Sequence, residues 1–491
     1  MTTEHHRVVI VGAGFGGIGA AVRLLRKGVS DFVILEAAGA PGGTWRDNSY
    51  PGCQCDIPSN LYSLSFAPNP AWSTTFPVQP EIRDYIEKVV TRFDLHKFTR
   101  YHTELLDAHW DASETQWRIT TSAGELSANV LILAMGFLSE PFVPALNGLD
   151  SFRGPTFHSA RWDHDVDLAG KRVAVVGTGA SAVQLIPEIA PRVGHLDVYQ
   201  RTPAWVLPHM DRRVTRFEQW LYRGLPFAQG IRRAMTYVIS ESRHAVLTRT
   251  GLLNRAARAL ARANIRRAVP DPELVARLTP RYELGCKRVL LSNRYYPALA
   301  RPNVDVVSDR VVGATPTGVV TGSGDERPAD VVIFATGFKI TNRACYRRIR
   351  GEGGLDLASS FDEHGAYLGL TAAGFPNLFC IAGPTSGVGH TSFLFMIESQ
   401  QAYVADAVAA MVSRSLGSVE VRKEVQDGYF HRIQADTTGK VWASGCTSWF
   451  LDEKGRNVAV WPGYSWTFHR RTRRFDERSY HVTAGTARDV P

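Results

Sequence analysis

Two stretches of the chain share a glycine-rich pattern that binds phosphate. In the first, the apolar residues 7–11 run into Gly12-Ala-Gly14-Phe-Gly-Gly17, which opens a helical run. A strand, turn and helix of this kind present the free N–H groups of a helix N-terminus to a pyrophosphate, and glycines permit the tight turn and the close approach. A second apolar strand over 31–35 ends in Glu36, whose carboxylate can accept both hydroxyls of an adenosine ribose. The first stretch therefore predicts a dinucleotide site.

The second stretch follows the same template with one change of charge. Residues 171–176 run into Gly177-Thr178-Gly179-Ala-Ser181, and the strand over 195–199 leads to Arg201 and Thr202. Arg201 and Glu36 each lie 24 residues after the first glycine of their stretch, so a base stands where the first stretch has an acid. A carboxylate repels a ribose 2′-phosphate, whereas a guanidinium binds it bidentately. The first site therefore suits FAD, and the second suits NADP rather than NAD.

Two different dinucleotide sites in one chain indicate flavin chemistry, because a nicotinamide passes hydride to a flavin that then acts on something else. We predict an α/β protein with two Rossmann-like dinucleotide-binding domains, one for FAD and one for NADP, and a helical insertion. The predicted FAD-binding domain is discontinuous, since a buried strand and glycine turn recur after residue 375; it comprises residues 1–146 and 375–491. A linker over 147–169 precedes the NADP-binding domain, 170–374, whose helical insert covers about 210–285. The nucleotide unit within that domain ends near Gly337.

Charge is concentrated in the helical insert. The chain has a net charge of +9, and residues 211–267 alone hold thirteen arginines and three acids, about +10. Such a segment is either a solvated face of an amphipathic helical unit or a surface that touches an anionic lipid or nucleic acid. We favour the solvated face and predict no nucleic-acid partner; a weak peripheral contact with a membrane stays open. The sequence does not indicate an oligomeric state.

The remaining composition is that of an ordinary globular protein, with 44% hydrophobic and 21% charged residues. No apolar run reaches the roughly 20 residues that span a bilayer, and we expect no signal peptide, because an apolar strand begins a few residues into the chain. The six cysteines are scattered, with Cys53 and Cys55 as the only close pair. That pattern completes neither a zinc site nor a redox Cys-x-x-Cys motif. We therefore predict reduced thiols, no metal site and a cytoplasmic location.

Two longer motifs carry a family resemblance. The segment between the nucleotide units reads Phe152-Arg-Gly154-Pro-Thr-Phe-His158-Ser-Ala-Arg-Trp162-Asp163. It resembles the fingerprint of Baeyer–Villiger monooxygenases at every fixed position, and its Trp-Asp ending favours that branch over the microsomal-type flavin monooxygenases. Upstream, Gly42-Gly43-Thr44-Trp45 through Tyr50-Pro51-Gly52 to Asp56 looks like a second signature of the same family. The resemblance covers residue 7 to roughly 400. The tail, from Val441-Trp442 to Trp461-Pro-Gly463, looks like that of a hydroxyacetophenone-monooxygenase-like subgroup.

The resemblance implies roles for particular residues. Arg288 would stand near the flavin and stabilise the negatively charged C4a-peroxyflavin, Asp56 would pair with Arg288 and orient it, and Lys287 would help Arg201 hold the 2′-phosphate. His158 would couple domain movement to NADP binding rather than act as a base. The predicted catalytic residues are Arg288 and Asp56. The predicted contacts to the cofactors are Gly12, Gly14, Gly17, Glu36, Gly43, Thr44, Trp45, Asp56 and Tyr62 for FAD, and Gly177, Thr178, Gly179, Ser181, Arg201, Thr202 and Lys287 for NADP.

The resemblance implies an NADPH-dependent flavin monooxygenase that inserts one oxygen atom of O2 next to a ketone carbonyl, giving an ester or lactone. The main alternative is a monooxygenase on the same scaffold that oxidises sulfur or nitrogen. A flavin disulfide reductase is disfavoured, because no Cys-x-x-Cys lies near either glycine turn, and a non-catalytic NADPH sensor is disfavoured by the intact signatures. Ser49 and Gln54 stand where cyclohexanone-type members usually carry arginine. Substrate preference is therefore not carried over from those enzymes.

Overall fold

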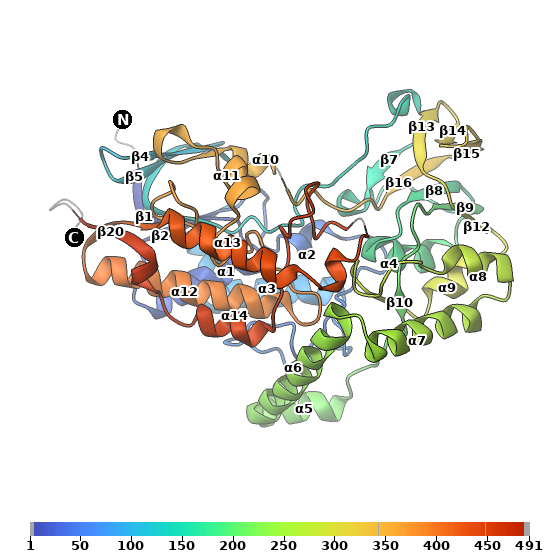
Figure 1. Ribbon diagram of the computed structural model, residues 1–491, viewed down its shortest axis with the longest axis horizontal. Coiled ribbons are helices and arrows are strands. Elements are labelled where there is room, and N and C mark those ends of the chain that lie inside the picture. Colours follow the sequence, from blue (N-terminus) through green and yellow to red (C-terminus); the bar gives the residue numbers. More distant parts are fainter. Residues whose placement is uncertain (1–3, 342, 447, 486–491) are drawn as a thin grey trace.

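The two glycine-rich stretches form two separate sheets, which lie side by side along the long axis of the molecule (Figure 1). The computed structural model describes residues 4–341, 343–446 and 448–485. The larger sheet has eight strands in the order β17-β4-β5-β6-β1-β2-β3, with β18 also paired to β6. These strands are β1 (Glu4–Val11), β2 (Phe32–Leu35), β3 (Thr99–Arg100), β4 (Leu105–Asp111), β5 (Gln116–Thr121), β6 (Gly124–Leu133), β17 (Ile349–Arg350) and β18 (Leu378–Cys380).

The apolar run of β1 is unbroken because both faces of the strand are covered. Successive side chains of a strand point to opposite faces of its sheet. Val8 and Ile10 belong to a core shared with α1 (Phe15–Arg26), α3 (Gln79–Arg92) and α12 (Phe393–Ser413). Val9 and Val11 belong to a second core, shared with β4, β5 and α11 (Leu357–His364). A strand that is buried on both faces reads as a continuous apolar segment, as in the sequence.

The smaller sheet has five parallel strands in the order β12-β9-β8-β16-β7. They are β7 (Thr156–His158), β8 (Arg172–Val176), β9 (His195–Tyr199), β12 (Val304–Val307) and β16 (Val331–Phe334), with α4 (Ala180–Ile189) and α9 (Tyr295–Leu299) packed beside them. A three-stranded antiparallel sheet of β13 (Val311–Thr315), β14 (Gly318–Thr321) and β15 (Glu326–Pro328) contributes to the core on the other side. The two sheets confirm the predicted fold class.

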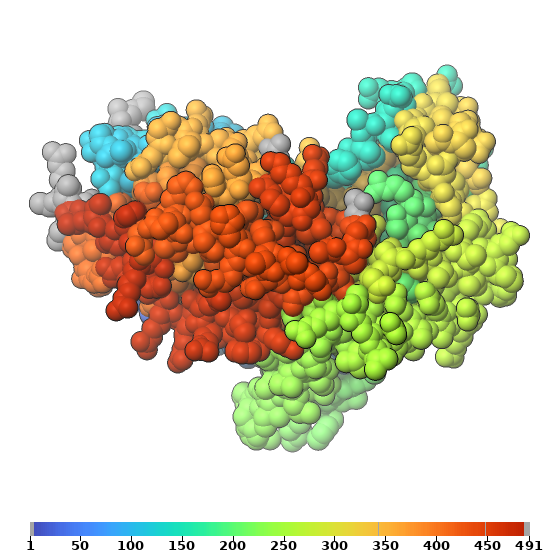
Figure 2. Space-filling model, viewed as in Figure 1, coloured from blue at the N-terminus to red at the C-terminus, as the bar shows by residue number. Residues whose placement is uncertain are grey.

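The helical insert leaves the smaller sheet after β9 and returns to it before β12. It contains α5 (Arg216–Gly224), α6 (Pro226–Thr248), α7 (Leu252–Ala268) and α8 (Pro272–Leu278). The strands β10 (Val206–Leu207) and β11 (Leu290–Leu291) pair in parallel and close its base. The helices α5 and α6 project from the body of the molecule, at the bottom of the view in Figures 1 and 2.

The C-terminal part of the chain returns to the larger sheet, where β18 pairs in parallel with β6. The return begins earlier than residue 375, because β17 already pairs with β4, and α10 (Ala344–Arg347) and α11 pack into the second core of that sheet. At the other boundary, the strand β7 of the predicted linker is the edge strand of the smaller sheet. The linker is thus partly built into the domain that follows it.

The rest of the C-terminal part covers the larger sheet with α12, α13 (Lys423–Thr437) and α14 (Ser465–Arg471), as Figure 1 shows. The strands β19 (Leu416–Val421) and β20 (Tyr480–Ala484) form an antiparallel pair near the end of the chain. None of the helices in the described ranges combines the length and apolar character needed to cross a membrane.

One prediction about the cysteines is wrong. Cys286 and Cys446 form a disulfide, although all six cysteines were expected to be reduced. The two residues are 160 positions apart in the sequence, and the fold brings the C-terminal segment against the loop before β11 that carries Cys286. Spacing rules detect only local pairs of cysteines, so the sequence offered no signal for this one. Cys53, Cys55, Cys345 and Cys380 are free.

Candidate active site

The first glycine turn has no room for side chains at two of its glycines. Gly12 has φ of +106°, and a Cβ at this residue would lie 2.7 Å from the carbonyl oxygen of Ala134. A Cβ at Gly17 would lie 1.9 Å from the carbonyl oxygen of Gly12. Gly12 therefore allows the turn, and Gly17 allows α1 to pack directly on the strand.

Gly14 forms the N-cap of α1, where a glycine offers no side chain to satisfy the first N–H groups of the helix. Gly43, at φ of +52°, faces it, since a Cβ on Gly43 would lie 3.2 Å from the Cα of Gly14. Thr44 and Trp45 follow Gly43 in the short helix α2 (Thr44–Asp47). Two bare backbone turns thus meet at the N-terminus of a helix, an arrangement that fits a pyrophosphate.

Glu36 is buried at the end of β2 and is held from several sides. Its carboxylate accepts hydrogen bonds from the N–H groups of Ala13 and Ala38, both at 2.9 Å, and from the Arg46 guanidinium at 2.8 Å. The oxygen that accepts from Ala13 retains acceptor capacity, because each carboxylate oxygen has two lone pairs. The geometry therefore fits a ribose hydroxyl as a further donor.

The second unit repeats the turn at Gly177, where φ is +122° and a Cβ would lie 2.3 Å from the carbonyl oxygen of Ala335. Gly179 is the N-cap of α4, and Ser181 lies in the first turn of that helix. The Thr178 hydroxyl donates a hydrogen bond of 3.0 Å to the carbonyl oxygen of Thr202. This bond ties the glycine turn to the end of the second strand, as the template requires.

Arg201 and Lys287 form a pair of cations at the end of that strand. Arg201 is exposed and Lys287 is partly buried, with its ammonium group 5.3 Å from the ring centre of Tyr282. Burial and the nearby charge of Arg201 lower the pKa of Lys287. Within the described residues neither cation has a carboxylate within ion-pair distance. Two like charges held together without a counter-ion fit an anionic ligand such as a 2′-phosphate.

Arg288 and Asp56 form a bidentate ion pair between the two units. The guanidinium nitrogens Nε and Nη2 lie 2.9 and 2.8 Å from different carboxylate oxygens, and Nη2 also lies 2.7 Å from the second oxygen. The Asp56 charge raises the pKa of Arg288, so the guanidinium stays charged at any working pH. About a third of the Arg288 side chain is exposed (33%). The pair therefore holds a fixed, accessible positive charge.

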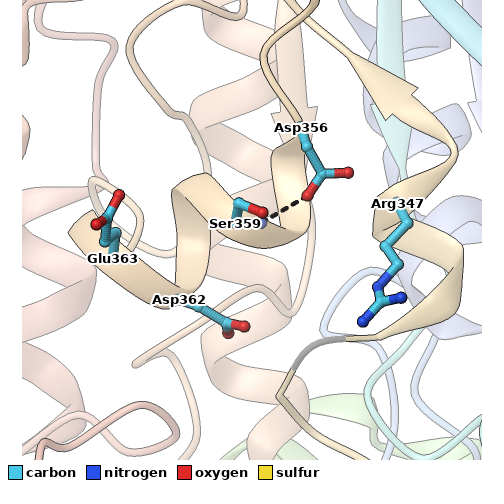
Figure 3. A pocket seen from close by; sticks show the side chains of 5 residues that line it. All are labelled: Arg347, Asp356, Ser359, Asp362 and Glu363. Carbon is cyan, nitrogen blue, oxygen red and sulfur yellow. Dashed lines mark hydrogen bonds between the residues drawn. The ribbon is translucent and has the colours of Figure 1, made fainter.

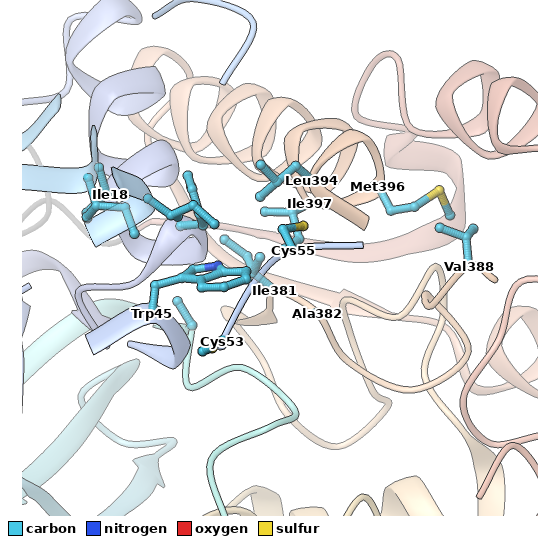
Figure 4. Close-up of a cluster of buried hydrophobic side chains, with 14 of the residues drawn as sticks. Ile18, Trp45, Cys53, Cys55, Ile381, Ala382, Val388, Leu394, Met396 and Ile397 are labelled. Carbon is cyan, nitrogen blue, oxygen red and sulfur yellow. The ribbon is translucent and has the colours of Figure 1, made fainter. Parts of the chain in front are cut away.

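The buried side chains next to Asp56 in the sequence belong to an apolar wall, part of which Figure 4 shows. Trp45, Cys53 and Cys55 lie in one buried cluster with Ile381 and residues of α12. Burial raises the pKa of Cys53 to about 12 and that of Cys55 well above its usual range. These thiols therefore stay protonated and poorly nucleophilic.

Tyr62 is held against the same wall. Its hydroxyl accepts a hydrogen bond of 2.9 Å from the Trp45 indole, and its ring meets Phe15 of α1 edge to face at 5.7 Å. Burial raises the Tyr62 pKa, so its hydroxyl stays neutral. The predicted FAD contacts Trp45 and Tyr62 therefore belong to one packed unit that lies beside the first glycine turn.

Gln184 of α4 was not anticipated from the sequence. Its amide oxygen accepts a hydrogen bond of 2.8 Å from the Tyr50 hydroxyl, and its amide nitrogen donates one of 2.8 Å to the carbonyl oxygen of Gln54. Ser49 likewise bonds His164 of the linker at 2.8 Å. The second signature is thus fastened to the NADP unit and to the linker. In the sequence, the only sign of this role is that Gln184 is a polar residue on the inner face of its helix.

His158 is buried at the end of β7, where its Nδ1 accepts a hydrogen bond of 3.0 Å from the N–H of Ala160. Burial lowers the pKa of His158 to about 4. The imidazole is therefore neutral near pH 7. It lies in the second sheet beside Phe338, with ring centres 5.7 Å apart, and it does not contact the Arg288–Asp56 pair.

Two hollows open on the surface. One, of about 610 Å³, is open and lined by Arg347, Asp356, Ser359, Asp362 and Glu363 (Figure 3), with Asp356 capping α11 through the Ser359 N–H. It contains none of the predicted site residues. A smaller one of about 170 Å³ lies between Pro51, Trp162 and Arg192, where the two signatures meet the NADP unit.

A group of His195, Asp197 and Asp305 brings ligand atoms within 4.8 Å of one another. Both carboxylates already have a cationic partner, because Arg327 lies 2.6 Å from an oxygen of each of them. The group therefore has the geometry of an ion pair network rather than a vacant cation site.

Comparisons with known proteins agree with this geometry. Residues 9–221 match the family model described as pyridine nucleotide-disulphide oxidoreductase. A Baeyer–Villiger monooxygenase of Streptomyces coelicolor is 47% identical over 482 residues, which cover 98% of this chain and 93% of that protein.

Two solved structures have a similar fold. A cyclohexanone monooxygenase from Rhodococcus sp. Phi1 bound to NADP+ superposes with a TM-score of 0.87 at 30% identity, covering 99% of this chain and 100% of that chain. OTEMO in complex with FAD and NADP gives 0.88 at 26% identity, covering 98% and 100%. The chain belongs to the Baeyer–Villiger monooxygenase family.

Proposed function

We propose that this chain uses FAD, NADPH and O2 to insert one oxygen atom between a ketone carbonyl and its neighbouring carbon, releasing an ester or lactone. The other oxygen atom leaves as water, and NADPH supplies the two electrons. The bidentate Arg288–Asp56 pair, held between two dinucleotide turns, is the observation that carries this proposal. Bound FAD would supply the reduction and activation of O2.

The first unit would hold FAD. The N–H groups at the start of α1 would bind the pyrophosphate in the space between Gly14 and Gly43. Glu36 would accept a ribose hydroxyl, for which its carboxylate is already oriented by Ala13 and Arg46. The wall of Trp45 and Tyr62 would exclude water from one side of the flavin.

The second unit would hold NADP. Gly177, Thr178, Gly179 and Ser181 would bind its pyrophosphate at the N-terminus of α4. Arg201 and Lys287, with Thr202 beside them, would hold the 2′-phosphate, whose charge removes the repulsion between the two cations. This arrangement supports NADP over NAD.

Arg288 would stabilise negative charge that develops beside the flavin. A cation in a partly dry site acts through a strong local field, and arginine keeps its charge there whereas lysine is able to lose it. Asp56 would fix the direction of the guanidinium without neutralising its exposed edge, because a third of the side chain stays accessible. Asp56 is therefore a positioning residue in this proposal and Arg288 the catalytic one.

We also propose domain boundaries that follow the strand pairing. The FAD-binding domain would comprise residues 4–146 and the part from about 344 onward, because β17 and α11 pack with the larger sheet. The cytoplasm, which supplies NADPH, stays the proposed location, although a disulfide such as Cys286–Cys446 is uncommon in that compartment. The tail resemblance to hydroxyacetophenone-type enzymes supports an aryl ketone as one substrate class to test.

Purified enzyme should consume NADPH and O2 only when a ketone is present, and mass spectrometry should find the ester or lactone with one added oxygen atom. A panel of cyclohexanone, an aryl methyl ketone and a thioether separates the main proposal from its rival. Faster turnover of the thioether than of every ketone, with sulfoxide as the product, would favour oxidation at sulfur instead.

A further inference from the structure

The helix α6 exposes its apolar face to solvent and buries its polar face. Its solvent face carries Phe227, Ile231, Met235, Val238 and Ile239, which are 53% to 65% exposed. A helix of about 3.6 residues per turn places these side chains on one face. An ordinary surface helix shows the opposite arrangement, with the apolar stripe toward the core.

The inner face of α6 is polar and well bonded. Gln229 donates a hydrogen bond of 2.7 Å to the carbonyl oxygen of Asn69, and Tyr237 bonds Ser465 at 3.0 Å. Glu241 accepts a hydrogen bond of 3.2 Å from the Ser465 N–H and lies 3.2 Å from His390. These buried partners fix the rotation of the helix about its axis. The apolar face is therefore held outward rather than free to turn in.

The exposed apolar surface continues onto the neighbouring elements. Phe217 and Trp220 of α5 are about two-thirds exposed and stack on each other, with ring centres 5.8 Å apart. Leu252 and Leu253 begin α7 and are also exposed. Of the nineteen large apolar side chains that the described residues expose, twelve fall within residues 210–260. An apolar surface so concentrated marks an interaction site.

Basic side chains border this surface. Arg216 and Arg223 of α5 and Arg232 and Arg243 of α6 are exposed, and the helical repeat places Arg232 and Arg243 along one edge of the apolar face of α6. An apolar face that carries phenylalanine and tryptophan and is edged with arginine is typical of helices that lie in a membrane interface. Residues 211–267 carry thirteen arginines against three acids, which suits an anionic headgroup layer.

We infer that α5 and α6, with the start of α7, form a docking surface for an anionic phospholipid bilayer. A second copy of the chain fits less well, because a symmetric interface would bring the same arginines against one another. Nucleic acid also fits less well, since aliphatic side chains gain nothing from a phosphate backbone. The α5–α6 protrusion lies at the edge of the molecule in Figures 1 and 2, with the exposed apolar face of α6 directed away from its bonded inner face, so a flat surface can reach it. The helices would lie in the interface, because none of those described can cross a bilayer.

The test is flotation of the FAD-loaded enzyme with vesicles of phosphatidylcholine alone or with 30% phosphatidylglycerol, a fraction of about a third chosen to give a strongly anionic surface. We expect binding to the anionic vesicles at least about tenfold stronger than to the neutral ones, and weaker binding as salt rises. The double variant Ile231→Ser, Val238→Ser should lose at least about tenfold in binding without any change of charge. Arg232→Gln, Arg243→Gln should lose on the order of tenfold on anionic vesicles only.

The matched control is Leu106→Ser, Leu355→Ser, which removes two exposed apolar side chains from the larger-sheet domain. This control should bind vesicles as the wild-type protein does, and retained yellow colour shows that each variant is folded. Absence of vesicle binding by the wild-type protein would overturn the inference. So would a dimer, found by light scattering, that Ile231→Ser, Val238→Ser dissociates, or DNA binding that outcompetes anionic vesicles. None of these results bears on the proposed ketone oxidation.

Discussion

The first glycine-rich unit ends its second strand in a buried acid, whereas the second unit ends it in an exposed base. Glu36 is 5% exposed, and backbone N–H groups and Arg46 already satisfy it. Arg201 is exposed, and its positive charge is repelled by the positive charge of its neighbour Lys287. The two units share a backbone template, with a glycine at positive φ and a second glycine as the N-cap of the helix.

This difference separates a site organised before its ligand arrives from one that the ligand completes. The first unit is preorganised and deeply packed, which favours a cofactor that stays bound. The second unit holds two like charges that a 2′-phosphate relieves, which favours a cofactor that binds, reacts and exchanges. One backbone template thus serves a resident and an exchanging nucleotide, and the change lies in a few side chains.

The largest effect that tests this comparison comes from placing a valine in each of the two glycine turns. Gly14→Val should abolish FAD binding, because the valine γ-carbons enter the gap between Gly14 and Gly43, whose backbones already approach closely. The purified variant should be colourless. Gly179→Val is the matched change in the second unit, where nothing lies within 4 Å of the added Cβ; it should keep the yellow colour and lose NADPH binding.

Absorbance at the flavin band and fluorescence titration with NADPH check both variants, and circular dichroism shows whether each is folded. A folded Gly14→Val protein with full FAD occupancy would mean that the first turn does not hold the flavin. Loss of flavin from Gly179→Val instead would reverse the assignment of the two units.

The next effect concerns the charge between the two units. Arg288→Ala should keep FAD, since Arg288 lies outside the first glycine turn, and should lose about 10²–10³ in the rate of ester formation, as removal of one preorganised stabiliser commonly does. NADPH oxidation should persist in part by releasing hydrogen peroxide. Product analysis and a peroxide assay separate the two outcomes.

Arg294→Ala is the control, because Arg294 is a surface arginine, 64% exposed, that pairs with Glu188. It should form ester at the wild-type rate. If Arg288→Ala did so too, the catalytic part of the proposed function would be wrong, while the family assignment and both nucleotide sites would stand.

A smaller effect distinguishes the two nicotinamide cofactors. Arg201→Ala should raise KM for NADPH by about 10–150-fold, equivalent to about 1.5–3 kcal/mol for one charge-assisted contact. NADH lacks the 2′-phosphate, so its KM should change little and serves as the internal control. Steady-state kinetics with both cofactors measure the ratio, and equal changes in the two KM values would remove Arg201 from the phosphate site.

Local patterns in the sequence were enough to predict the two glycine turns. Strand, turn and helix follow one another within some 30 residues, and backbone sterics fix where Gly12 and Gly177 must stand. The Arg288–Asp56 pair joins residues 232 positions apart, and only the family resemblance connected them. The bonds of Gln184 to Tyr50 and Gln54 were not predicted, because neither a local pattern nor the family resemblance pointed to them. Contacts between domains depend on tertiary packing, which local periodicity does not encode.

The helical insert shows a second limit. Its sequence predicted helices and a charged surface, and the structure has both. Periodicity in α6 reveals that the helix has an apolar face but not which way the face points. That direction is set by the bonds of Gln229, Tyr237 and Glu241 to distant segments. The early return of the chain to the larger sheet at β17 was hidden for a similar reason, because two residues of strand carry no pattern.

The disulfide was missed for the same reason of distance, and its removal has the smallest predicted effect on catalysis. It joins Cys286, the residue before Lys287 and Arg288, to Cys446 in the C-terminal segment. Cys286→Ser should lower the melting temperature by a few degrees, because a native disulfide typically contributes about 2–4 kcal/mol. Catalysis should change little, since the Asp56 ion pair also holds Arg288 in place. Differential scanning fluorimetry measures the shift.

A reducing agent provides the control for this variant. Dithiothreitol should lower the melting temperature of the wild-type protein to that of Cys286→Ser and leave the variant unchanged, because only the wild-type protein has a bond to lose. Cys345 is free in the structure, so Cys345→Ser keeps the disulfide. Dithiothreitol should lower the melting temperature of this variant by the same amount as that of the wild-type protein. If the reducing agent left the wild-type melting temperature unaltered, while mass spectrometry after alkylation detected both thiols in the untreated protein, the two cysteines would be reduced in solution. The loop that carries Lys287 and Arg288 would then depend on the Asp56 ion pair and on the backbone bonds of the strand that follows it, such as that from Leu290 to Trp205.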